Sequence, residues 1–431
     1  VLPAFLAPFI VLAARYHITI QRVLSLFGAL ALIAVGLGLS VEASSGTVML
    51  YQLSDWAAPF GIVLVGDRLS TLMVTLTAVH ALFQFQLMGI MGAFLTGDLF
   101  NLFVFFEVLL IASYGLMIHG GGTLRLRAGV QYVLYNLLGS TLFLFALGAI
   151  YAETGTLNMA DLAQRVALID AGETVGIRIA AVLLLMVFAV KAAVVPLHFW
   201  LPSSYAEAPG PVAALFAIMT KVGAYAIIRV YTLIFPPNLA ATADLHTTWL
   251  LPAALLSLAL GMIGVLAAKQ LDRLVAFSVI GSMGMVMISI ALFTPEGIAA
   301  ALYYIVHSTL AAGALFLIAD LARAGRDNLD LTAQPQVAGA KLTAALFFVA
   351  AIAMVGVPPL SGFVGKLLIM DAAAQNEFWV WIWAVILGAS LLSLVGFGRA
   401  GSMVFWKSRS VAPEEGATPA EAPSALSYVA V

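Results

Sequence analysis

Cysteine is absent from this chain of 431 residues, and charged residues are scarce, at 9%. Without cysteine, the chain by itself forms no disulfide, no thiolate nucleophile and no cysteine-ligated zinc or iron–sulfur site. A soluble domain carries about 25% charged and about 45–50% apolar residues, whereas 63% of this chain is hydrophobic. The composition therefore excludes an ordinary soluble enzyme and a disordered chain, and the net charge of −2 implies no nucleic-acid partner.

Apolar residues are abundant instead, and the mean hydropathy is +1.08. They form about thirteen runs, most of them near the roughly 20 residues that a helix needs to cross a bilayer. The sequence therefore predicts an all-α polytopic protein in a lipid bilayer, with about 13–14 transmembrane helices. We expect the chain to be trimmed at both ends, and the first run lacks the basic region of a signal peptide. The runs are 1–14, 23–41, 61–80, 81–96, 99–118, 129–150, 177–199, 212–235, 249–268, 274–293, 298–321, 342–370 and 376–398.

Positive charges alternate from one connection between runs to the next. Most of the 19 Lys and Arg residues lie in every second connection, and the connections between these hold mostly acids. This alternation follows the positive-inside rule and predicts that the basic connections are cytoplasmic. Arg68, Arg165 and Arg178 are exceptions on the acidic side. Arg229 lies within the run 212–235, and we expect its side chain to extend outward to the membrane surface.

The pattern is irregular near His80. Residues 61–97 must supply two antiparallel spans, yet no polar residue separates His80 from Ala81. A turn between antiparallel helices must leave the hydrocarbon, so we expect residues to be missing between His80 and Phe85. The alternative is one long tilted helix, which would reverse the topology of everything that follows.

Two polar segments and one acid at a span start have their own interpretations. The loop 151–176 holds spaced apolar residues among acids, which favours a short interfacial helix. The tail 408–426 is rich in Pro, Ala and Glu and is typical of a flexible linker. Asp98 directly precedes the run 99–118. It is either a helix cap or the outer end of a path to Glu107.

Four charged residues lie near the middle of apolar runs: Glu107, Lys191, Lys221 and Lys366. An unpaired charge at the bilayer centre costs at least about 2.5–3.5 kcal/mol, and such residues mark ion or proton pathways. The alternative is a structural ion pair, such as Glu107 with Lys191, but this leaves two lysines uncompensated. His307, also within an apolar run, is either a member of a proton path or a hydrogen-bonded packing residue.

Two of these lysines lie beside helix breakers. Lys191 precedes Pro196 in VKAAVVPLHFWLP, and Lys366 follows the Pro-Pro pair of GVPPLSGFVGK. Proline removes an intrahelical hydrogen bond, and unwound backbone inside a membrane is tolerated where it lines a cavity. Interrupted helices in corresponding positions of two halves indicate the binding site of a transporter.

Three long motifs around these residues carry a family resemblance. GAFLTGDLFNLFVFFEVLLIASYGL, KAAVVPLHFWLPSSYAEAPGPVAALFAIMTKVGAYAIIR and GVPPLSGFVGK resemble the proton-translocating antiporter-like family shared by respiratory complex I, membrane-bound hydrogenases and Mrp-type cation/proton antiporters. FNLFVFFE, TGTLNMADLA and YYIVHSTLAAGALFLIADL are most similar to the D-type subunits of Mrp antiporters. The resemblance covers nearly the whole chain.

The resemblance implies a fold of two inverted five-helix repeats, each with a broken helix. It places N-terminal peripheral helices in 1–80, the first antiporter-like repeat in 81–235 and the second in 249–400. A cytoplasmic linker in 401–431 would lead to a last helix.

The resemblance also implies a role for each buried residue. The essential glutamate of the family matches Glu107, and the lysine of its first broken helix matches Lys191. Lys221 matches the lysine of the following helix, His307 the central histidine and Lys366 the lysine of the second broken helix. These five residues are expected to form the path for protons, with no cofactor and no metal site.

The expected function is that of one component in a multi-subunit antiporter that exchanges protons for Na⁺ or another monovalent cation. Its partners would be the other Mrp subunits, namely a large A-type subunit together with small hydrophobic subunits, in the bacterial inner membrane. The chain would be part of a secondary transporter and not an enzyme. One alternative is the proton-pumping membrane subunit of a complex I-like quinone oxidoreductase or hydrogenase. A third interpretation is a transporter that works alone.

Overall fold

The protein is described here from a computed structural model. The expected first run at 1–14, the residues between His80 and Gln84, and most of the predicted linker lie outside the described part of the chain. The structure describes residues 18–52, 63–80, 84–169, 174–239, 242–243, 246–324, 326, 328–335, 339–411 and 428.

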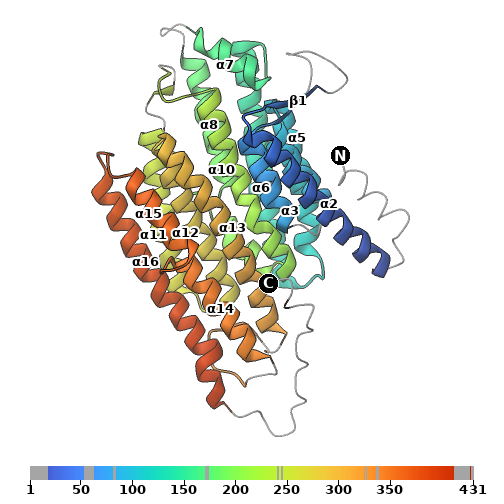
Figure 1. The fold of residues 1–431 in the computed structure, drawn as a ribbon, viewed down its shortest axis with the longest axis vertical. Coiled ribbons are helices and arrows are strands. Elements are labelled where there is room, and N and C mark those ends of the chain that lie inside the picture. The colour runs from blue at the N-terminus through green and yellow to red at the C-terminus, as the bar shows by residue number, and fades with distance from the viewer. Residues whose placement is uncertain are drawn as a thin grey trace. The chain divides into compact units, whose positions relative to one another are not determined.

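Helices make up most of the described chain (Figure 1). One small antiparallel sheet pairs β1 (Met49–Gln52) with β2 (Val63–Gly66). Short π-helical or 3₁₀ turns cover His246–Leu250, Ser402–Trp406 and Lys407–Ser410. The α-helices are α2 (Ile18–Ser44), α3 (Arg68–His80), α4 (Gln84–Leu95), α5 (Leu99–Ile118), α6 (Thr123–Thr154), α7 (Met159–Ala167), α8 (Val175–Lys191), α9 (Trp200–Glu207), α10 (Gly210–Leu233), α11 (Leu251–Ala267), α12 (Leu271–Ala291), α13 (Pro295–Arg323), α14 (Ala340–Val355), α15 (Ser361–Ala372) and α16 (Trp379–Gly401).

These helices confirm the predicted all-α membrane architecture, with one local correction. Among the described residues, seven helices are long and apolar enough to cross a membrane. The run 61–80 is not one span, because it begins with strand β2 and its helix α3 has only 13 residues. Helices α3 and α4 are separate and pack against each other, so one long helix does not replace them.

Both helices with prolines near a buried lysine are interrupted, as predicted. Helix α8 ends at Lys191, and residues 192–199 form irregular turns before α9. Helix α14 ends at Val355, and Gly356 follows with φ +75°, a conformation that glycine adopts without strain. The next helix, α15, begins at Ser361.

The chain forms two compact units. The first comprises residues 1–116, 133–191 and 222–244, and the second comprises 117–132, 192–221 and 245–431. In the second unit, α11 packs against α12 and α16, and α13 packs against α12, α14 and α15, as can be followed in Figure 1. The repeat boundaries expected at 81–235 and 249–400 remain a prediction.

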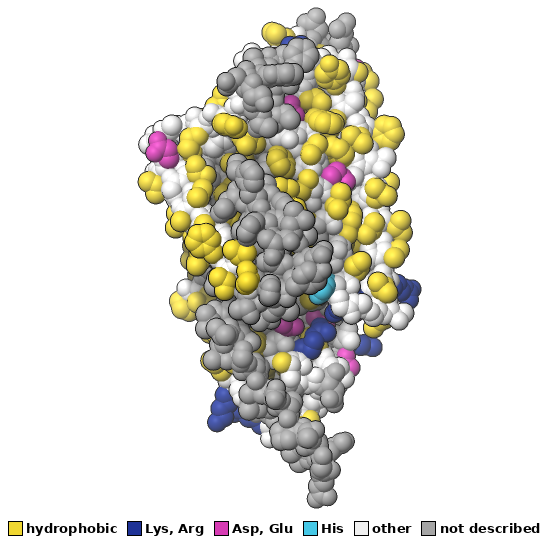
Figure 2. Space-filling model, turned by 90° about the vertical axis from the view of Figure 1, so that its right-hand side faces the viewer, with side chains coloured by type: hydrophobic (Ala, Val, Ile, Leu, Met, Phe, Trp, Pro, Cys, Tyr) yellow, Lys and Arg dark blue, Asp and Glu magenta, His cyan; other side chains and the backbone are white. Residues whose placement is uncertain are grey.

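Large apolar side chains are exposed on the outer faces of several helices. Phe145 on α6 is 65% exposed and Leu391 on α16 is 62% exposed. Figure 2 shows one face of the molecule, on which hydrophobic side chains are spread widely between few charged ones. A soluble monomer rarely exposes so much contiguous apolar surface, whereas lipid tails cover such faces at no cost.

The expected short helix in the loop 151–176 is α7. Its residues Met159, Leu162 and Val166 are buried on one face. Asn158 caps its first turn by accepting from the N–H groups of Ala160 and Asp161. The predicted short helix is therefore present and amphipathic, and its position at the membrane interface stays a prediction.

Asp98 caps helix α5. Its Oδ1 accepts from the backbone N–H of Asn101 at 2.8 Å, which is the geometry of an N-cap residue. Asp98 also forms an isolated bridge with Asn158, so the start of α5 and the start of α7 are joined. The helix-cap interpretation is thus confirmed, and a path from Asp98 to Glu107 stays a prediction.

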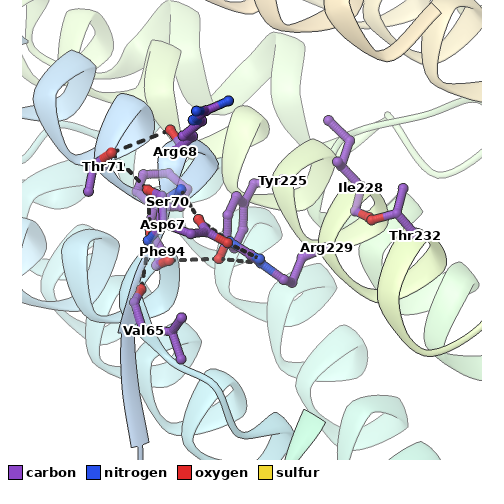
Figure 3. A network of polar contacts seen from close by, with 10 residues as sticks. All are labelled: Val65, Asp67, Arg68, Ser70, Thr71, Phe94, Tyr225, Ile228, Arg229 and Thr232. Atoms are coloured by element: carbon purple, nitrogen blue, oxygen red, sulfur yellow. Dashed lines mark hydrogen bonds and ion pairs between the residues drawn. The ribbon is translucent and has the colours of Figure 1, made fainter. Parts of the chain in front are cut away.

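Arg229 does not extend outward, contrary to expectation. Its guanidinium donates to both carboxylate oxygens of Asp67, at 2.6 and 2.8 Å (Figure 3). Its Nε donates to the hydroxyl of Tyr225 at 3.1 Å, and that hydroxyl donates to the carbonyl of Phe94 at 2.6 Å. The arginine side chain is 14% exposed. A partner 162 residues away in the chain, rather than the membrane surface, satisfies its charge.

Asp67 also starts helix α3. Its Oδ1 accepts from the N–H of Ser70, and the Ser70 hydroxyl accepts from the N–H of Asp67, which is a reciprocal capping arrangement. The same carboxylate therefore holds the first turn of α3 and the side chain of Arg229 on α10 (Figure 3). This links the N-terminal helices to α10 within the first unit.

The three arginines that break the charge alternation are all bound to backbone carbonyls. Arg68 donates to the carbonyls of Ala43 and Ser44 at the end of α2, at 3.2 and 2.9 Å. Arg165 donates to the carbonyl of Thr154, the last residue of α6, and Arg178 to a loop carbonyl at 3.5 Å. Cations at helix C-termini complement the helix dipole, which accounts for the first two.

We predict that Asp67→Asn lowers the free energy of unfolding by about 2–3 kcal/mol, because it leaves the Arg229 guanidinium without its counter-charge. Asparagine is also a good N-cap residue, so the start of α3 is preserved. Thermal unfolding of the purified complex in detergent measures the change. Asp161→Asn is the control, since it removes one charge from the more exposed ion pair with Arg165, and such pairs contribute little. Equal melting temperatures for all three proteins would contradict the prediction.

We also predict how this stabilisation depends on pH. Burial raises the pKa of Asp67, but hydrogen bonds and charge from Arg229, with hydrogen bonds from Ser70, outweigh it and lower the pKa to about 2. A lowered pKa contributes stability that is complete above about pH 4 and is lost as pH falls toward 2. The difference in melting temperature between wild type and Asp67→Asn should therefore be constant from about pH 5 to 9. A difference that changes across this range would contradict the assignment.

Candidate functional site

Glu107 and Lys191 lie in the first unit, and one serine contacts both. Lys191, the last residue of α8, is 4% exposed. Its Nζ donates to the hydroxyl of Ser140 on α6 at 3.4 Å, and that hydroxyl donates to Oε1 of Glu107 on α5. The ion pairs within 4.0 Å among the described residues do not include Glu107 with Lys191. The two charges are joined through Ser140 rather than in a direct salt bridge.

Asn136 completes the surroundings of the Lys191 ammonium. The Nζ atom lies 3.3 Å from the main-chain oxygen of Asn136 and 3.4 Å from its side-chain oxygen. Asn136 and Ser140 are four residues apart, so they lie on the same face of α6. The lysine is thus held by neutral oxygens.

Lys366 in the second unit has a similar environment. Its Nζ donates to the carbonyl of Val355 at 2.6 Å and to the hydroxyl of Ser390 on α16 at 2.7 Å. In an uninterrupted helix the N–H of residue 359 would bond to this carbonyl, but Pro359 has no N–H. The lysine therefore supplies the donor that the helix break removes.

His307 contacts the same helix break from α13. Its Nδ1 lies 2.9 Å from the hydroxyl of Ser361, the first residue of α15. Its Nε2 is buried and has no hydrogen-bond partner among the described residues. A Cβ at Gly362 would lie 2.8 Å from this Nε2 and would overlap the carbonyl oxygen of Ala353. The break is therefore closely packed around the imidazole.

Lys221 has one hydrogen-bond contact among those described, and it interacts electrostatically with His307. It lies on α10, its side chain is fully buried, and its Nζ is 3.5 Å from the hydroxyl of Thr220. Such a burial costs several kcal/mol for a charged group that is not compensated. Its position in the middle of the helix agrees with the sequence analysis.

The structure groups the predicted residues into three local sites. Glu107 and Lys191 share Ser140, and His307 and Lys366 lie at the same helix break. Lys221 lies on α10 beside Thr220, and its charge, like that of Lys366, acts on His307. In the described part of the chain, no three His, Asp or Glu side chains converge in a way that would hold a metal ion.

Three serine partners of the site residues were not predicted from the sequence, namely Ser140 beside Lys191, Ser390 beside Lys366 and Ser361 beside His307. Ser140, Ser390 and Ser361 are short polar residues in apolar helices, where serine commonly bonds to its own backbone. The spacing of Asn136 and Ser140 was the one available signal, because it places two polar groups on one face of α6.

Comparison with known proteins identifies the family. The family model described as NADH:quinone oxidoreductase/Mrp antiporter, TM, matches residues 96–393, which is more than half of the chain. The chain belongs to this family. The resemblance inferred from the motifs is thereby confirmed, and with its long apolar helices the protein is a multi-pass membrane protein.

Relatives with curated names are D-type subunits of antiporters. The one from a probable K⁺/H⁺ antiporter of Rhizobium meliloti (strain 1021) is 39% identical over 409 residues, covering 83% of this chain and 76% of that protein. The one from a Na⁺/H⁺ antiporter of Alkalihalophilus pseudofirmus is 38% identical over 432 residues, covering 94% of this chain and 85% of that protein.

Solved structures with the same fold belong to multi-subunit membrane complexes. A chain of the Mrp complex from Dietzia sp. DQ12-45-1b has a TM-score of 0.82 and 30% identity, covering 94% of this chain and 79% of that chain. A chain of respiratory complex I from Thermus thermophilus has a TM-score of 0.83 and 26% identity, covering 100% of this chain and 91% of that chain.

We predict that Gly362→Ala damages the second helix break, because the added methyl overlaps the Ala353 carbonyl and crowds His307. Overpacking of this kind costs about 1–3 kcal/mol. Gly388→Ala on α16 is the matched control, since a Cβ there meets nothing within 4 Å. The melting temperature of the purified complex should fall for the first variant and not for the second. Equal stability of the two variants would contradict the packing at the break.

Proposed function

We propose that the protein is a proton-translocating subunit of a multi-subunit antiporter in the bacterial cell membrane. The complex exchanges protons for a monovalent cation, and the proton-motive force drives it, at about 2.3 kcal/mol per charge and 100 mV. The names of the relatives support this proposal, since chains that are 38–39% identical are described as D-type subunits of Na⁺/H⁺ or K⁺/H⁺ antiporters. The chain acts as a transporter subunit, with no chemical reaction of its own.

The surroundings of two lysines support the proposed proton path. Lys191 and Lys366 are surrounded by hydroxyl and carbonyl oxygens instead of fixed carboxylate partners. A carboxylate in a buried salt bridge strongly favours the charged form of a lysine. Neutral oxygens favour the ammonium less strongly, so loss of its proton costs less free energy. Glu107, Lys191, Lys221, His307 and Lys366 together form the proposed proton relay.

The same chemistry indicates which subunit carries the cation. Positive side chains along a path repel a second cation, so this chain carries the protons and a partner protein of the complex carries the cation. The relatives support no single ion, because the Rhizobium meliloti relative is named for K⁺ and the Alkalihalophilus pseudofirmus relative for Na⁺. The partners include the other Mrp subunits, as in the Mrp complex that shares this fold.

A complex I-like proton pump is the second candidate, and the fold of the Thermus thermophilus complex I chain favours it equally. Sequence identity favours the antiporter, at 30% to the Mrp chain against 26% to the complex I chain. Membrane vesicles separate the two candidates. An antiporter moves protons when a Na⁺ or K⁺ gradient is imposed without redox substrate, and a redox pump does not.

We predict that Lys191→Ala and Glu107→Gln each lower cation-driven proton flux on the order of 100-fold, since positioned acid–base groups contribute about 10²–10⁴-fold to proton transfer. Vesicles containing the complete complex and a pH-sensitive dye measure the flux. Lys407→Ala and Glu296→Gln remove exposed charges of the same kinds and should leave the flux unchanged. Full flux in the Lys191→Ala complex would overturn the proposed relay.

A further inference from the structure

Ser140 is the group that both Glu107 and Lys191 touch. Its hydroxyl donates to Glu107 Oε1 and accepts from Lys191 Nζ at 3.4 Å. The same hydroxyl lies 3.0 Å from the main-chain oxygen of Asn136, one turn earlier in α6. Ser140 and Lys191 are 5% and 4% exposed, so both side chains are shielded from bulk water.

The hydroxyl of Ser140 can adopt two hydrogen-bond arrangements. A serine hydroxyl has one proton to donate and two lone pairs that accept. The proton points either to the carboxylate of Glu107 or to the carbonyl of Asn136, and in both cases a lone pair faces the ammonium of Lys191. Rotation about one bond switches between the two arrangements.

Aromatic rings line the same site and offer no competing hydrogen-bond groups. Phe106, Phe143 and Phe188 are at most 1% exposed, and their ring centroids lie 5.5–6.5 Å apart. The ring of Phe106 lies 6.0 Å from Nζ of Lys191. The hydroxyl of Ser140 therefore connects the two charged residues beside these rings.

We propose that the proton passes between Lys191 and Glu107 through the hydroxyl of Ser140. This rests on the proposed function, in which these two residues exchange a proton. An N–H bond of the Lys191 ammonium breaks and an O–H bond forms on Ser140, while the former hydroxyl proton bonds to Glu107 Oε1. The lysine becomes a neutral amine and the carboxylate a carboxylic acid. Rotation of the hydroxyl toward Asn136 and back restores the starting arrangement.

Ser390 shows what a serine does without a second charged partner. It accepts from Lys366 at 2.7 Å, but its own proton goes to the carbonyl of Ile386, at 2.7 Å, within α16. Ser390 therefore orients an ammonium, whereas Ser140 also reaches a carboxylate. The contact with Glu107 distinguishes a proton relay from a positioning residue.

Antiport by the complete complex in vesicles tests the proposal. Ser140→Ala removes the hydroxyl and should lower cation-driven proton flux at least about 10-fold, in a complex that still assembles, because alanine keeps the helix. Ser140→Thr keeps a hydroxyl and should retain most of the flux. Thr141→Ala, the neighbouring position, whose hydroxyl bonds only to its own helix among the contacts described, is the matched control and should behave as wild type.

The result for Glu107→Gln and Lys191→Ala separates this inference from the proposed function. If both variants lose flux and Ser140→Ala keeps it, the inference is wrong and the proposed relay stands. If Glu107→Gln and Lys191→Ala keep their flux, the relay itself fails. Should Ser140→Ala fail to assemble, Ser140→Cys decides, because a thiol is a weak donor and acceptor. Reduced flux then supports the relay, and wild-type flux overturns it.

Discussion

Each helix end or helix break leaves backbone carbonyls without an intrahelical donor, and hydrocarbon contains no water to replace it. In this protein, basic side chains supply many of the missing donors. Arg68 and Arg165 bind carbonyls at the ends of α2 and α6, and Arg399 binds the carbonyl of Ala268 after α11. These three arginines thus supply donors to carbonyls at or just after the ends of helices.

The same requirement operates at the centre of the second unit, where it has a functional consequence. Pro359 removes the donor for the Val355 carbonyl, and the Lys366 ammonium replaces it. The Val355 carbonyl requires a hydrogen-bond donor, and the residue that provides it is ionisable. Lys366 thus lies in an apolar segment without a carboxylate partner among the described residues. A serine and main-chain or amide oxygens surround Lys191 in a comparable way.

Hydropathy predicted most of the helices, and proline positions predicted both breaks, because each depends on local sequence. The orientation inferred from charge alternation stays a prediction. The ion pair of Arg229 with Asp67 was not predictable in this way, since 162 residues separate its members. Strand β2 was missed because its apolar residues continue directly into α3. The serine partners were not predicted because their role depends on which helix packs against them. The hydrophobic periodicity of one helix does not identify the neighbouring helix.

Asp67 both caps α3 and is the counter-ion of Arg229. Its double role affects the order in which contacts form during synthesis. The ribosome synthesises Arg229 162 residues after Asp67. At a synthesis rate of about 5–20 residues per second, Arg229 is added roughly 8–32 seconds after Asp67. The ion pair between the start of α3 and α10 can therefore form only after most of the first unit has been synthesised. Its formation is a late step of membrane assembly.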